Sequence, residues 1–497
     1  MEMKVAKLPM GRRSFTAGDV VMCCEPVVWV LESGAYKTRC AYCLRQSQNL
    51  VTCARCNLHR YCSVACQTAD LELEHNLECT LLQQATGMET APTPPDSSAE
   101  YSFDVPQELI AKLANKIKLN QMVDVPGMGQ KSVKDLLSIL PTNPDQAEIE
   151  RSLLPKISAG ESKHSMLIDL PAADVLTYFG ILRYNVLSLF DGLFSPNPRI
   201  GLALYPHGPH SMTPVCWDIN VVVNYQARRT VMHAVEDIPQ YTGPSDLRHT
   251  TILKVFCLTR AERRAAFEHH HGYPCTCRRC TPEYDAEINP LRCVMKGCSN
   301  RIPSDSRAQQ ACSDCGAINS DRLQKFREFS EQHEKIRTSY PEKRRAAMVL
   351  QLCREIDAAG ILQPDAHFRY VCGWELPQKY FDENRYEEGW KMIAEMIVCV
   401  RKIYPKYAVF RARELNLAGW SAIDALEKRM QNIGPVPMSR SAILEVCELV
   451  KNYCGEAKDI LAKLFGTQCY GAQKFLATCG HVYMKAFRIQ QALYSRK

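Results

Sequence analysis

Residues 38–79 read TRCAYCLRQSQNLVTCARCNLHRYCSVACQTADLELEHNLEC and combine seven cysteines with a histidine at ligand spacing, His75. Cysteine at this density serves either the disulfides of secreted domains or the tetrahedral zinc sites of intracellular ones. The chain begins MEMKVAKLPMGRR, without an apolar run of signal-peptide length, and it contains no stretch of about 18 apolar residues. We therefore expect a soluble protein of a reducing compartment, in which these side chains bind zinc.

The ligand candidates of this segment form four pairs at the spacing of zinc knuckles or of one helical turn. Two pairs are C-x2-C and two stand four residues apart: Cys40 and Cys43, Cys53 and Cys56, Cys62 and Cys66, and His75 and Cys79. Four pairs make two complete four-ligand sites, either in succession or interleaved, and spacing alone does not choose between these arrangements. The segment is too polar to fold by burying a core, so metal binding would supply its folding energy.

The composition of the whole chain is that of an ordinary globular protein. Its 497 residues suggest two to four domains, with 46% hydrophobic and 23% charged residues. The net charge of +7, from 61 basic and 54 acidic residues, is a mild excess. The cysteine-rich segment contributes Arg45, Arg55 and Arg60, with Lys37 and Arg39 at its start, too few to form a stripe that follows phosphates. These observations do not favour a nucleic-acid-binding zinc protein.

Hydrophobic periodicity predicts helices and one hairpin in the remainder of the chain. Residues 84–101 are rich in Pro, Ser and Thr and read as a linker, followed by a helical stripe of Leu109, Leu113 and Ile117. A longer helix is predicted over residues 172–190, with one apolar face: Val175, Phe179, Leu182, Val186 and Leu189. The β-branched runs 219–225 and 230–238 predict a hairpin that turns at Gln226 to Arg229.

From about residue 322 the chain is predicted to be helical to its end. Amphipathic faces recur there, among them Trp390, Ile393, Ile397 and Val400 on one helix and Ile443, Val446 and Val450 on another. Paired helices of this kind suggest an α-solenoid of tetratricopeptide type, although no clean 34-residue repeat is present.

Two further cysteine sets lie between the hairpin and the helices. The sequence GYPCTCRRC, residues 272–280, brings Cys275, Cys277 and Cys280 together as a C-x-C-x2-C that would bind one zinc and still lacks a fourth ligand. Farther along, two short knuckles would suit a zinc ribbon, although one is C-x4-C where C-x2-C is usual: Cys293, Cys298, Cys312 and Cys315. The sequence leaves the metal content of this second set open.

The spacing of the first segment resembles that of the MYND zinc finger, a family in which the pairs interleave. The resemblance implies one zinc on Cys40, Cys43, Cys62 and Cys66 and another on Cys53, Cys56, His75 and Cys79. A finger near the N-terminus, a helix followed by a hairpin, a C-x-C-x2-C and a helical tail together resemble the SET and MYND domain family of protein-lysine methyltransferases. The order matches over essentially the whole chain, through the segments 11–26, 199–206 and 259–267.

This resemblance implies an α+β multidomain protein: a SET β-fold split by the MYND finger and followed by a tetratricopeptide-like helical domain. The expected divisions are an N-terminal SET part, the finger, a linker, a helical SET insert, the SET core, a cysteine-rich post-SET region and the helical domain, at residues 1–36, 37–80, 81–104, 105–165, 166–258, 259–320 and 321–497.

The resemblance also implies S-adenosylmethionine as a cofactor and a narrow channel for the substrate lysine. Four positions match residues that contact the cofactor or line its site in the family: Arg12, Asn185, His210 and Tyr273. Arg12 lies in a turn that departs from the family's Gly-x-Gly, because Arg13 stands where the second glycine belongs.

The sequence departs further from the family at an Asn-His-Ser-Cys-x-Pro-Asn segment. The matching residues 209–215, PHSMTPV, place Pro209, Met212 and Val215 where the two asparagines and the cysteine belong. Proline has neither a side-chain amide nor a backbone donor, so a cofactor hydrogen bond is lost. The missing cysteine normally completes the zinc site of the C-x-C-x2-C, and a thioether is a poor substitute for a thiolate. We therefore expect Cys216, or failing that a water molecule, to serve as the fourth ligand.

The catalytic tyrosine of the family also has no counterpart at its position. Alignment puts Thr251, Ile252 or Leu253 there, and no tyrosine lies between Tyr241 and Tyr273. No catalytic residue is therefore assigned.

We predict weak or absent methyl transfer and a scaffold role in protein interaction and transcription regulation, in the nucleus and the cytoplasm; the alternative is an active protein-lysine N-methyltransferase. The expected partners are histone or non-histone proteins, proline-rich peptides at the finger and chaperone-type proteins at the helical domain, with no membrane.

Overall fold

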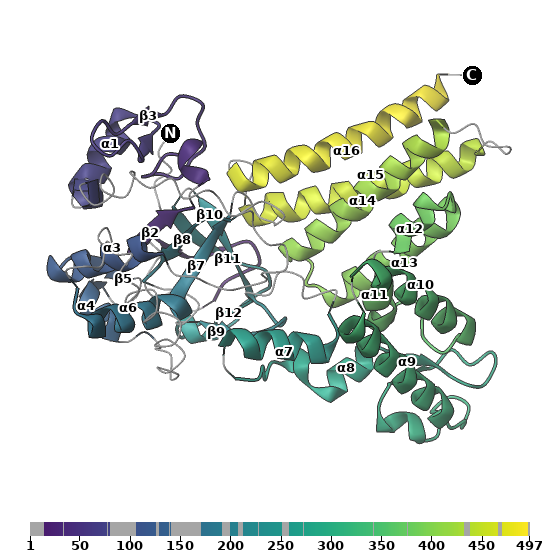
Figure 1. Ribbon diagram of the computed structural model, residues 1–497. Coiled ribbons are helices and arrows are strands. Elements are labelled where there is room, and N and C mark those ends of the chain that lie inside the picture. Colours follow the sequence, from purple (N-terminus) through teal and green to yellow (C-terminus); the bar gives the residue numbers. More distant parts are fainter. Residues whose placement is uncertain are drawn as a thin grey trace.

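The computed structural model describes most of the chain and has a mixed helix and strand part joined to a helical C-terminal part (Figure 1). The described residues are 14–32, 34–76, 78–79, 106–125, 129–138, 140, 170–190, 199–206, 212–226, 228–250, 258–271, 273–340, 342–374, 376–431, 438–465 and 470–495.

Strands from both sides of the cysteine-rich segment pair with one another. One sheet has the order β1-β11-β10 and the other β2-β8-β7, with bounds β1 Val20–Cys24, β2 Val28–Leu31, β7 Val186–Phe190, β8 Arg199–Leu204, β10 Val221–Gln226 and β11 Arg229–Ala234. The predicted hairpin is confirmed, because β10 and β11 are antiparallel with Gln226 opposite Arg229. β1 and β2 precede the cysteine-rich segment, so this segment is an insertion into the sheet region.

The helix predicted over residues 172–190 is wrong in its second part. Helix α6 (Ala172–Asn185) ends at Asn185, and residues 186–190 form strand β7. Val186 and Leu189 are both buried, but they belong to two different hydrophobic cores. Successive residues of a strand point to opposite faces, so an odd spacing of three places these side chains on opposite sides of the sheet.

The insert after the linker is helical only in part. Helix α3 (Gln107–Lys118) buries Leu109 and Leu113 against α6 and β2, in the core that also contains Val186. It is followed by an antiparallel hairpin, β5 (Met122–Val125) and β6 (Gly129–Ser132), and by helix α4 (Val133–Ser138). The predicted helical insert therefore also contains a hairpin.

A short parallel pair of strands joins the two ends of the segment 213–250. β9 (Thr213–Pro214) lies parallel to β12 (Arg248–His249). Asn220 connects the two segments, since its Oδ1 accepts from the Arg248 backbone N–H at 2.6 Å and its Nδ2 donates to the Asp246 carbonyl at 2.8 Å. Parallel strands need a long connection, which residues 215–247 supply here. The Val215 N–H donates to the His249 carbonyl at 2.8 Å, so the pairing also fixes the backbone directly before Cys216.

The predicted helical C-terminal region is confirmed. Helices α7 (Arg260–His271) and α8 (Pro282–Ile288) lead to a small hairpin, β13 (Leu291–Arg292) and β14 (Arg301–Ile302). The helices that follow are α9 Ser320–Ser339, α10 Glu342–Ala359, α11 His367–Gly373, α12 Leu376–Asp382, α13 Tyr386–Ile403, α14 Val409–Gln431, α15 Arg440–Phe465 and α16 Tyr470–Tyr494. No helix among the described residues is long and apolar enough to cross a bilayer.

Two separate cores stabilise this helical region. One is shared by α9–α12 and the β13–β14 segment. The other joins α13–α16 to residues 215–219 and to Phe267, and it includes the predicted faces of α13 and α15. At its end α15 reaches the β1-β11-β10 sheet, where Phe465 packs edge-on against His233 with ring centroids 5.0 Å apart (Figure 1).

Candidate metal centres and cofactor site

The cysteine-rich segment is a small finger whose ligand pairs interleave. Strands β3 (Val51–Thr52) and β4 (Arg60–Tyr61) flank the second C-x2-C, and helix α1 (Val64–Asp70) begins at the Ser63 N-cap. The ligand atoms gather in two groups, each within 4.8 Å: Cys40, Cys43, Cys62 and Cys66 in one, and Cys53, Cys56, His75 and Cys79 in the other. These are the groups that the interleaved arrangement requires.

The spacing of these atoms suits tetrahedral zinc. Four sulfurs at about 2.3 Å from a tetrahedral zinc lie about 3.8 Å from one another. The Cys43 and Cys66 sulfurs each lie 3.6 Å from that of Cys62, and the Cys53 and Cys79 sulfurs are 3.7 Å apart. Burial lowers the pKa of His75 to about 4, so its ring is neutral at pH 7, the form that binds metal.

A buried ionic network joins the finger to helix α3. The Lys112 ammonium donates to the Trp29 carbonyl at 2.9 Å and lies 3.3 Å from Glu78 and 3.6 Å from Glu108. Glu108 also accepts from the Tyr36 hydroxyl at 2.9 Å. Because Glu78 belongs to the finger and Lys112 to α3, this network fixes the finger against the sheet region.

His59 extends the network within the finger. It lies 3.5 Å from Asp70 and 3.8 Å from Glu108 and stacks on His75 with ring centroids 4.3 Å apart. Although burial opposes it, the pairing with Asp70 and Glu108 raises the pKa of His59 to about 9, so the ring is charged at pH 7. This network was not predicted from the sequence, where its only local signal is the i, i+4 spacing of Glu108 and Lys112 on a helix that also carries an apolar stripe.

The C-x-C-x2-C lies beside Cys216. The sulfur of Cys216 is 3.1 Å from that of Cys280 and 3.8 Å from that of Cys277, and the Cys216 N–H donates to the Cys275 sulfur at 3.3 Å. All four sulfurs lie within 4.8 Å of one another. Met212 instead packs in the hydrophobic core between the sheets, whereas Cys216, Cys275 and Cys280 belong to a different hydrophobic core. The donor set is therefore four cysteines, which is compatible with zinc.

Two of the four expected cofactor contacts lie in the described residues. Asn185 is buried at the end of α6, and its Nδ2 donates to the Ile181 carbonyl at 2.7 Å. Tyr273 is 48% exposed and packs edge-on against Phe267 at 5.6 Å. Arg12 and His210 lie outside the described residues, as does the stretch 251–253. The described contacts therefore bear on S-adenosylmethionine only in part, because one hydrogen of the Asn185 amide is engaged in its own helix and two of the four matching residues are not described.

The tyrosines on either side of residues 251–253 both have packing roles. Tyr241 packs edge-on against Phe15 with ring centroids 5.2 Å apart and contributes to the core between the sheets. Tyr273 packs on α7 through Phe267. Moving either hydroxyl away from its present position would therefore require breaking these ring contacts.

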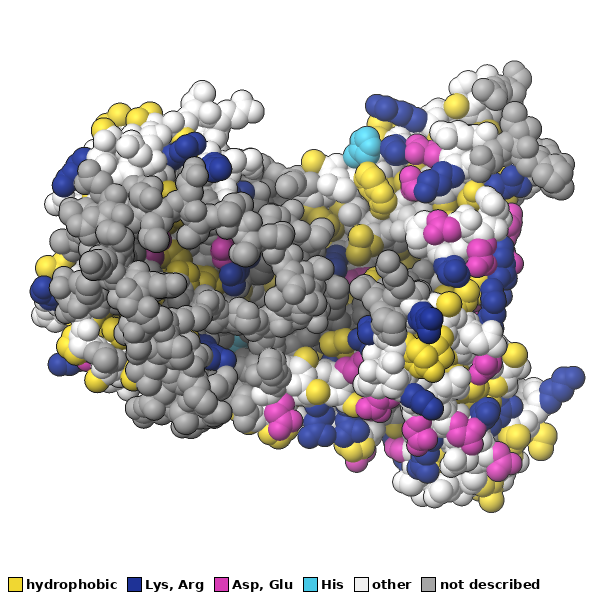
Figure 2. Space-filling view, in the orientation of Figure 1, with side chains coloured by type: hydrophobic (Ala, Val, Ile, Leu, Met, Phe, Trp, Pro, Cys, Tyr) yellow, Lys and Arg dark blue, Asp and Glu magenta, His cyan; other side chains and the backbone are white. Residues whose placement is uncertain are grey.

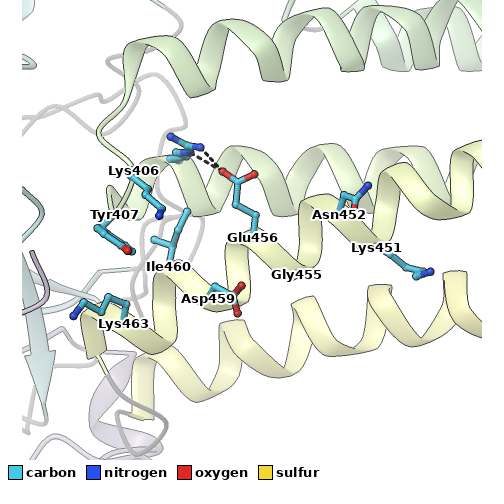
Figure 3. Close-up of a pocket in the computed structure, with 10 residues that line it drawn as sticks. Lys406, Tyr407, Lys451, Asn452, Gly455, Glu456, Asp459, Ile460 and Lys463 are labelled. Atoms are coloured by element: carbon cyan, nitrogen blue, oxygen red, sulfur yellow. Dashed lines mark hydrogen bonds and ion pairs between the residues drawn. The ribbon is translucent and has the colours of Figure 1, made fainter.

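A groove of about 650 Å³ lies beside α15, at the start of α14 (Figure 3). Four cationic side chains line it, Lys406, Arg411, Lys451 and Lys463, together with the carboxylates of Glu456 and Asp459. Arg411 and Arg401 both pair with Glu456. Over the helical region, the face shown in Figure 2 carries basic and acidic side chains in a mixed pattern.

Comparison with known proteins gives one domain match and several distant relatives. The MYND finger family matches residues 40–79. The chain is 23% identical over 284 residues to the N-lysine methyltransferase SMYD2-B of Danio rerio, covering 54% of this chain and 56% of the relative. It is 24% identical over 300 residues to the human histone-lysine N-methyltransferase SMYD3, covering 57% and 62%.

A plant relative is similar to the same degree: the histone-lysine N-methyltransferase ASHR1 of Arabidopsis thaliana is 23% identical over 332 residues, 63% of each chain. The matches thus span 56% to 63% of the length of these relatives.

Proposed function

We infer from its MYND finger and its homology to the SMYD lysine methyltransferases that this chain is a divergent member of that group, and we propose that its methyl transfer is weak or absent. In this proposal the protein acts as a zinc-stabilised scaffold for protein interaction. Its mixed helix and strand part is a SET fold split by the finger, and its helical part is a tetratricopeptide-like domain.

The observation that carries the proposal is the absence of a tyrosine at the position of the family's catalytic hydroxyl. The sequence has Thr251, Ile252 and Leu253 there, and the flanking Tyr241 and Tyr273 both pack against phenylalanine rings. Loss of one positioned donor from an active site costs roughly 10² to 10³-fold in rate. Pro209 in place of an asparagine removes a second contact of the cofactor site.

The zinc assignments in this proposal are two ions in the finger and one on Cys216, Cys275, Cys277 and Cys280. The three donor sets each gather within 4.8 Å, as tetrahedral coordination requires. Zinc in these sites would have a folding role, because the sites join segments that are distant in sequence.

The proposed partners are proteins. The finger exposes Val51 and Val64, which are 54% and 73% exposed, as apolar contacts for a proline-rich peptide. The groove beside α15 presents Lys406 and Lys463 to an acidic segment of a chaperone-type partner. Histone and non-histone proteins remain the proposed substrates of any residual activity, and we propose action in the nucleus and the cytoplasm.

An active protein-lysine N-methyltransferase is the second candidate, and the homology to enzymes of that name favours it. S-adenosylmethionine would supply an electrophilic methyl group bound to a sulfonium. The chain's own residues would have to hold the lysine amine in line and exclude water.

Restoring the missing groups distinguishes the two candidates. Purified, zinc-replete protein would be assayed for methyl transfer to histones and to a peptide library, beside variants with Pro209→Asn and Thr251→Tyr, Ile252→Tyr or Leu253→Tyr. The proposal predicts negligible turnover by the unaltered chain and a gain in one restored variant. Robust turnover by the unaltered chain would refute it.

A further inference from the structure

Four cysteines beyond the three sites above bring their sulfurs together. The Sγ atoms of Cys293, Cys298, Cys312 and Cys315 all lie within 4.8 Å of one another. Cys293 and Cys315 are 3.5 Å apart, and Cys298 and Cys312 are 3.8 Å apart. These separations match the roughly 3.8 Å edge of a tetrahedral zinc thiolate site and far exceed the roughly 2.05 Å of a disulfide.

The second half of this cluster is a closed knuckle. The Cys312 N–H donates to the Ala317 carbonyl at 2.9 Å, and the Gly316 N–H donates back to the Cys312 carbonyl at 2.8 Å. An antiparallel bridge between Ala311 and Ile318 closes the loop around both cysteines. Gly316 has φ +75°, the left-handed conformation that a chain needs to reverse directly after the second ligand.

The finger contains the same backbone arrangement at its first ligand pair. The Cys40 N–H donates to the Arg45 carbonyl at 3.0 Å, and the Leu44 N–H donates to the Cys40 carbonyl at 2.9 Å. An antiparallel bridge joins Arg39 to Gln46, and Leu44 has φ +61°. The bonds, the bridge and the positive φ occur at the same offsets from the first cysteine in both knuckles, so residues 311–318 adopt the backbone of a MYND-type ligand turn.

The first half of the cluster accommodates its longer spacing. Cys293 directly follows β13, and Cys298 lies shortly before β14, so the hairpin brings the two together. Gly297, with φ +88°, makes the extra turn that a C-x4-C needs. Asn300 donates from Nδ2 to the Cys312 sulfur at 3.2 Å, as amide donors do to metal-bound thiolates.

We propose that Cys293, Cys298, Cys312 and Cys315 bind a zinc ion, in addition to the two sites of the finger and the site at Cys216. Four thiolates in tetrahedral arrangement favour zinc among the divalent ions of a cell, with iron as the competing occupant. This site rests on neither methyl transfer nor the proposed function.

The position of the site indicates that the ion stabilises the start of the helical region. Asn319 accepts from the Val294 N–H at 2.7 Å, donates its own N–H to the Ala308 carbonyl at 3.0 Å, and accepts from the Leu323 N–H of α9 at 3.1 Å. It therefore connects both knuckles to the first turn of α9. Cys293 and Cys312 also belong to the core shared by α9–α12, so loss of the ion would loosen these helices.

The test is a metal count by native mass spectrometry and elemental analysis of the full chain. Wild-type protein is expected to hold four zinc ions, and a Cys298→Ser, Cys312→Ser double variant three. Cys353→Ser is the matched control, because Cys353 is buried in the same core but outside the sulfur cluster. This control is expected to keep all four ions.

A second measurement needs no variant and therefore does not depend on how the variants fold. Cys315 is exposed to solvent. Brief alkylation of native wild-type protein, measured by peptide mass spectrometry, is nevertheless expected to spare it, because a metal-bound thiolate reacts slowly. After a strong chelator is added, Cys315 is expected to be labelled at least tenfold faster. Equal labelling with and without chelator, the same metal count in wild type and double variant, cysteines recovered as disulfides, or iron in place of zinc would each overturn the proposal.

Discussion

Replacing Lys112 with methionine should release the finger from helix α3. The ammonium lies 3.3 Å from Glu78 and 3.6 Å from Glu108, and at an effective dielectric constant of about 20 each such pair interacts by about 5 kcal/mol before desolvation is counted. Lysine's own desolvation offsets much of this sum. The measured cost of removing one partner of a buried ion pair is about 3 to 5 kcal/mol, and we expect a value in that range.

Native-state hydrogen exchange of the amides of α3 measures this change directly. A loss of about 3 to 5 kcal/mol in the opening free energy corresponds to exchange that is about 10² to nearly 10⁴-fold faster. The matched control is Lys325→Met, since Lys325 pairs with Glu328 at 2.9 Å on the exposed face of α9. Loss of that exposed ion pair should change amide hydrogen exchange by less than about fivefold.

A double variant tests whether the uncompensated charge is the cause. Adding Glu108→Gln to Lys112→Met neutralises one of the two buried carboxylates and should recover at least about 1 kcal/mol of the loss. If Lys112→Met exchanges like the Lys325→Met control, the network does not hold the finger in place and the reasoning fails.

Three other changes have defined outcomes. Cys216→Ala should lower bound zinc by one ion in native mass spectrometry, whereas Met212→Leu should not, because Met212 packs in an apolar core; equal losses would contradict the donor set. Burial lowers the pKa of His233 to about 4, so the free energy of unfolding is highest above pH 6.5, where the ring is neutral in both states, and falls as the pH drops toward 4. Urea unfolding should show that His233→Phe removes about 2 kcal/mol of the stability that the wild-type protein loses between pH 7 and pH 5. An unchanged pH profile would count against this. Gly201→Ala places a Cβ 2.2 Å from a backbone carbonyl of β2 and should lower the free energy of unfolding by about 1 to 3 kcal/mol, whereas Gly243→Ala, with open space around it, should be nearly neutral; equal free energies of unfolding for the two variants would refute the contact.

Local patterns predicted much of the fold because they depend on neighbours in sequence. The knuckle spacing of Cys40 and Cys43, the alternation in β10 and β11 and the stripe of Trp390 and Ile393 are each properties of one element. The same reasoning failed at Val186 and Leu189, since an apolar spacing of three fits a helix and also fits a strand that is buried on both faces.

The sites depended on contacts that no local pattern specifies. The position of Cys216 beside Cys280 depends on the pairing of β9 with β12, and the sequence suggested it only as a replacement for Met212. The ion pair of Lys112 with Glu78 joins an inserted finger to a later helix, so it was invisible before the fold was known. The cluster that includes Cys293 stayed open in the sequence because its wide knuckle has no usual spacing, and the backbone geometry now favours metal.

The most direct test of the account is the rate of methyl transfer by the zinc-replete chain relative to human SMYD3, measured on the same peptide library at saturating S-adenosylmethionine. In the proposed function, the substitutions at 209 and 251–253 would act mainly on the transition state, with a combined cost of roughly 3 to 6 kcal/mol if they are independent. The account predicts a rate at least about a hundredfold below that of the relative, from protein whose circular dichroism and zinc content show a complete fold. A rate within about tenfold of the relative would contradict it.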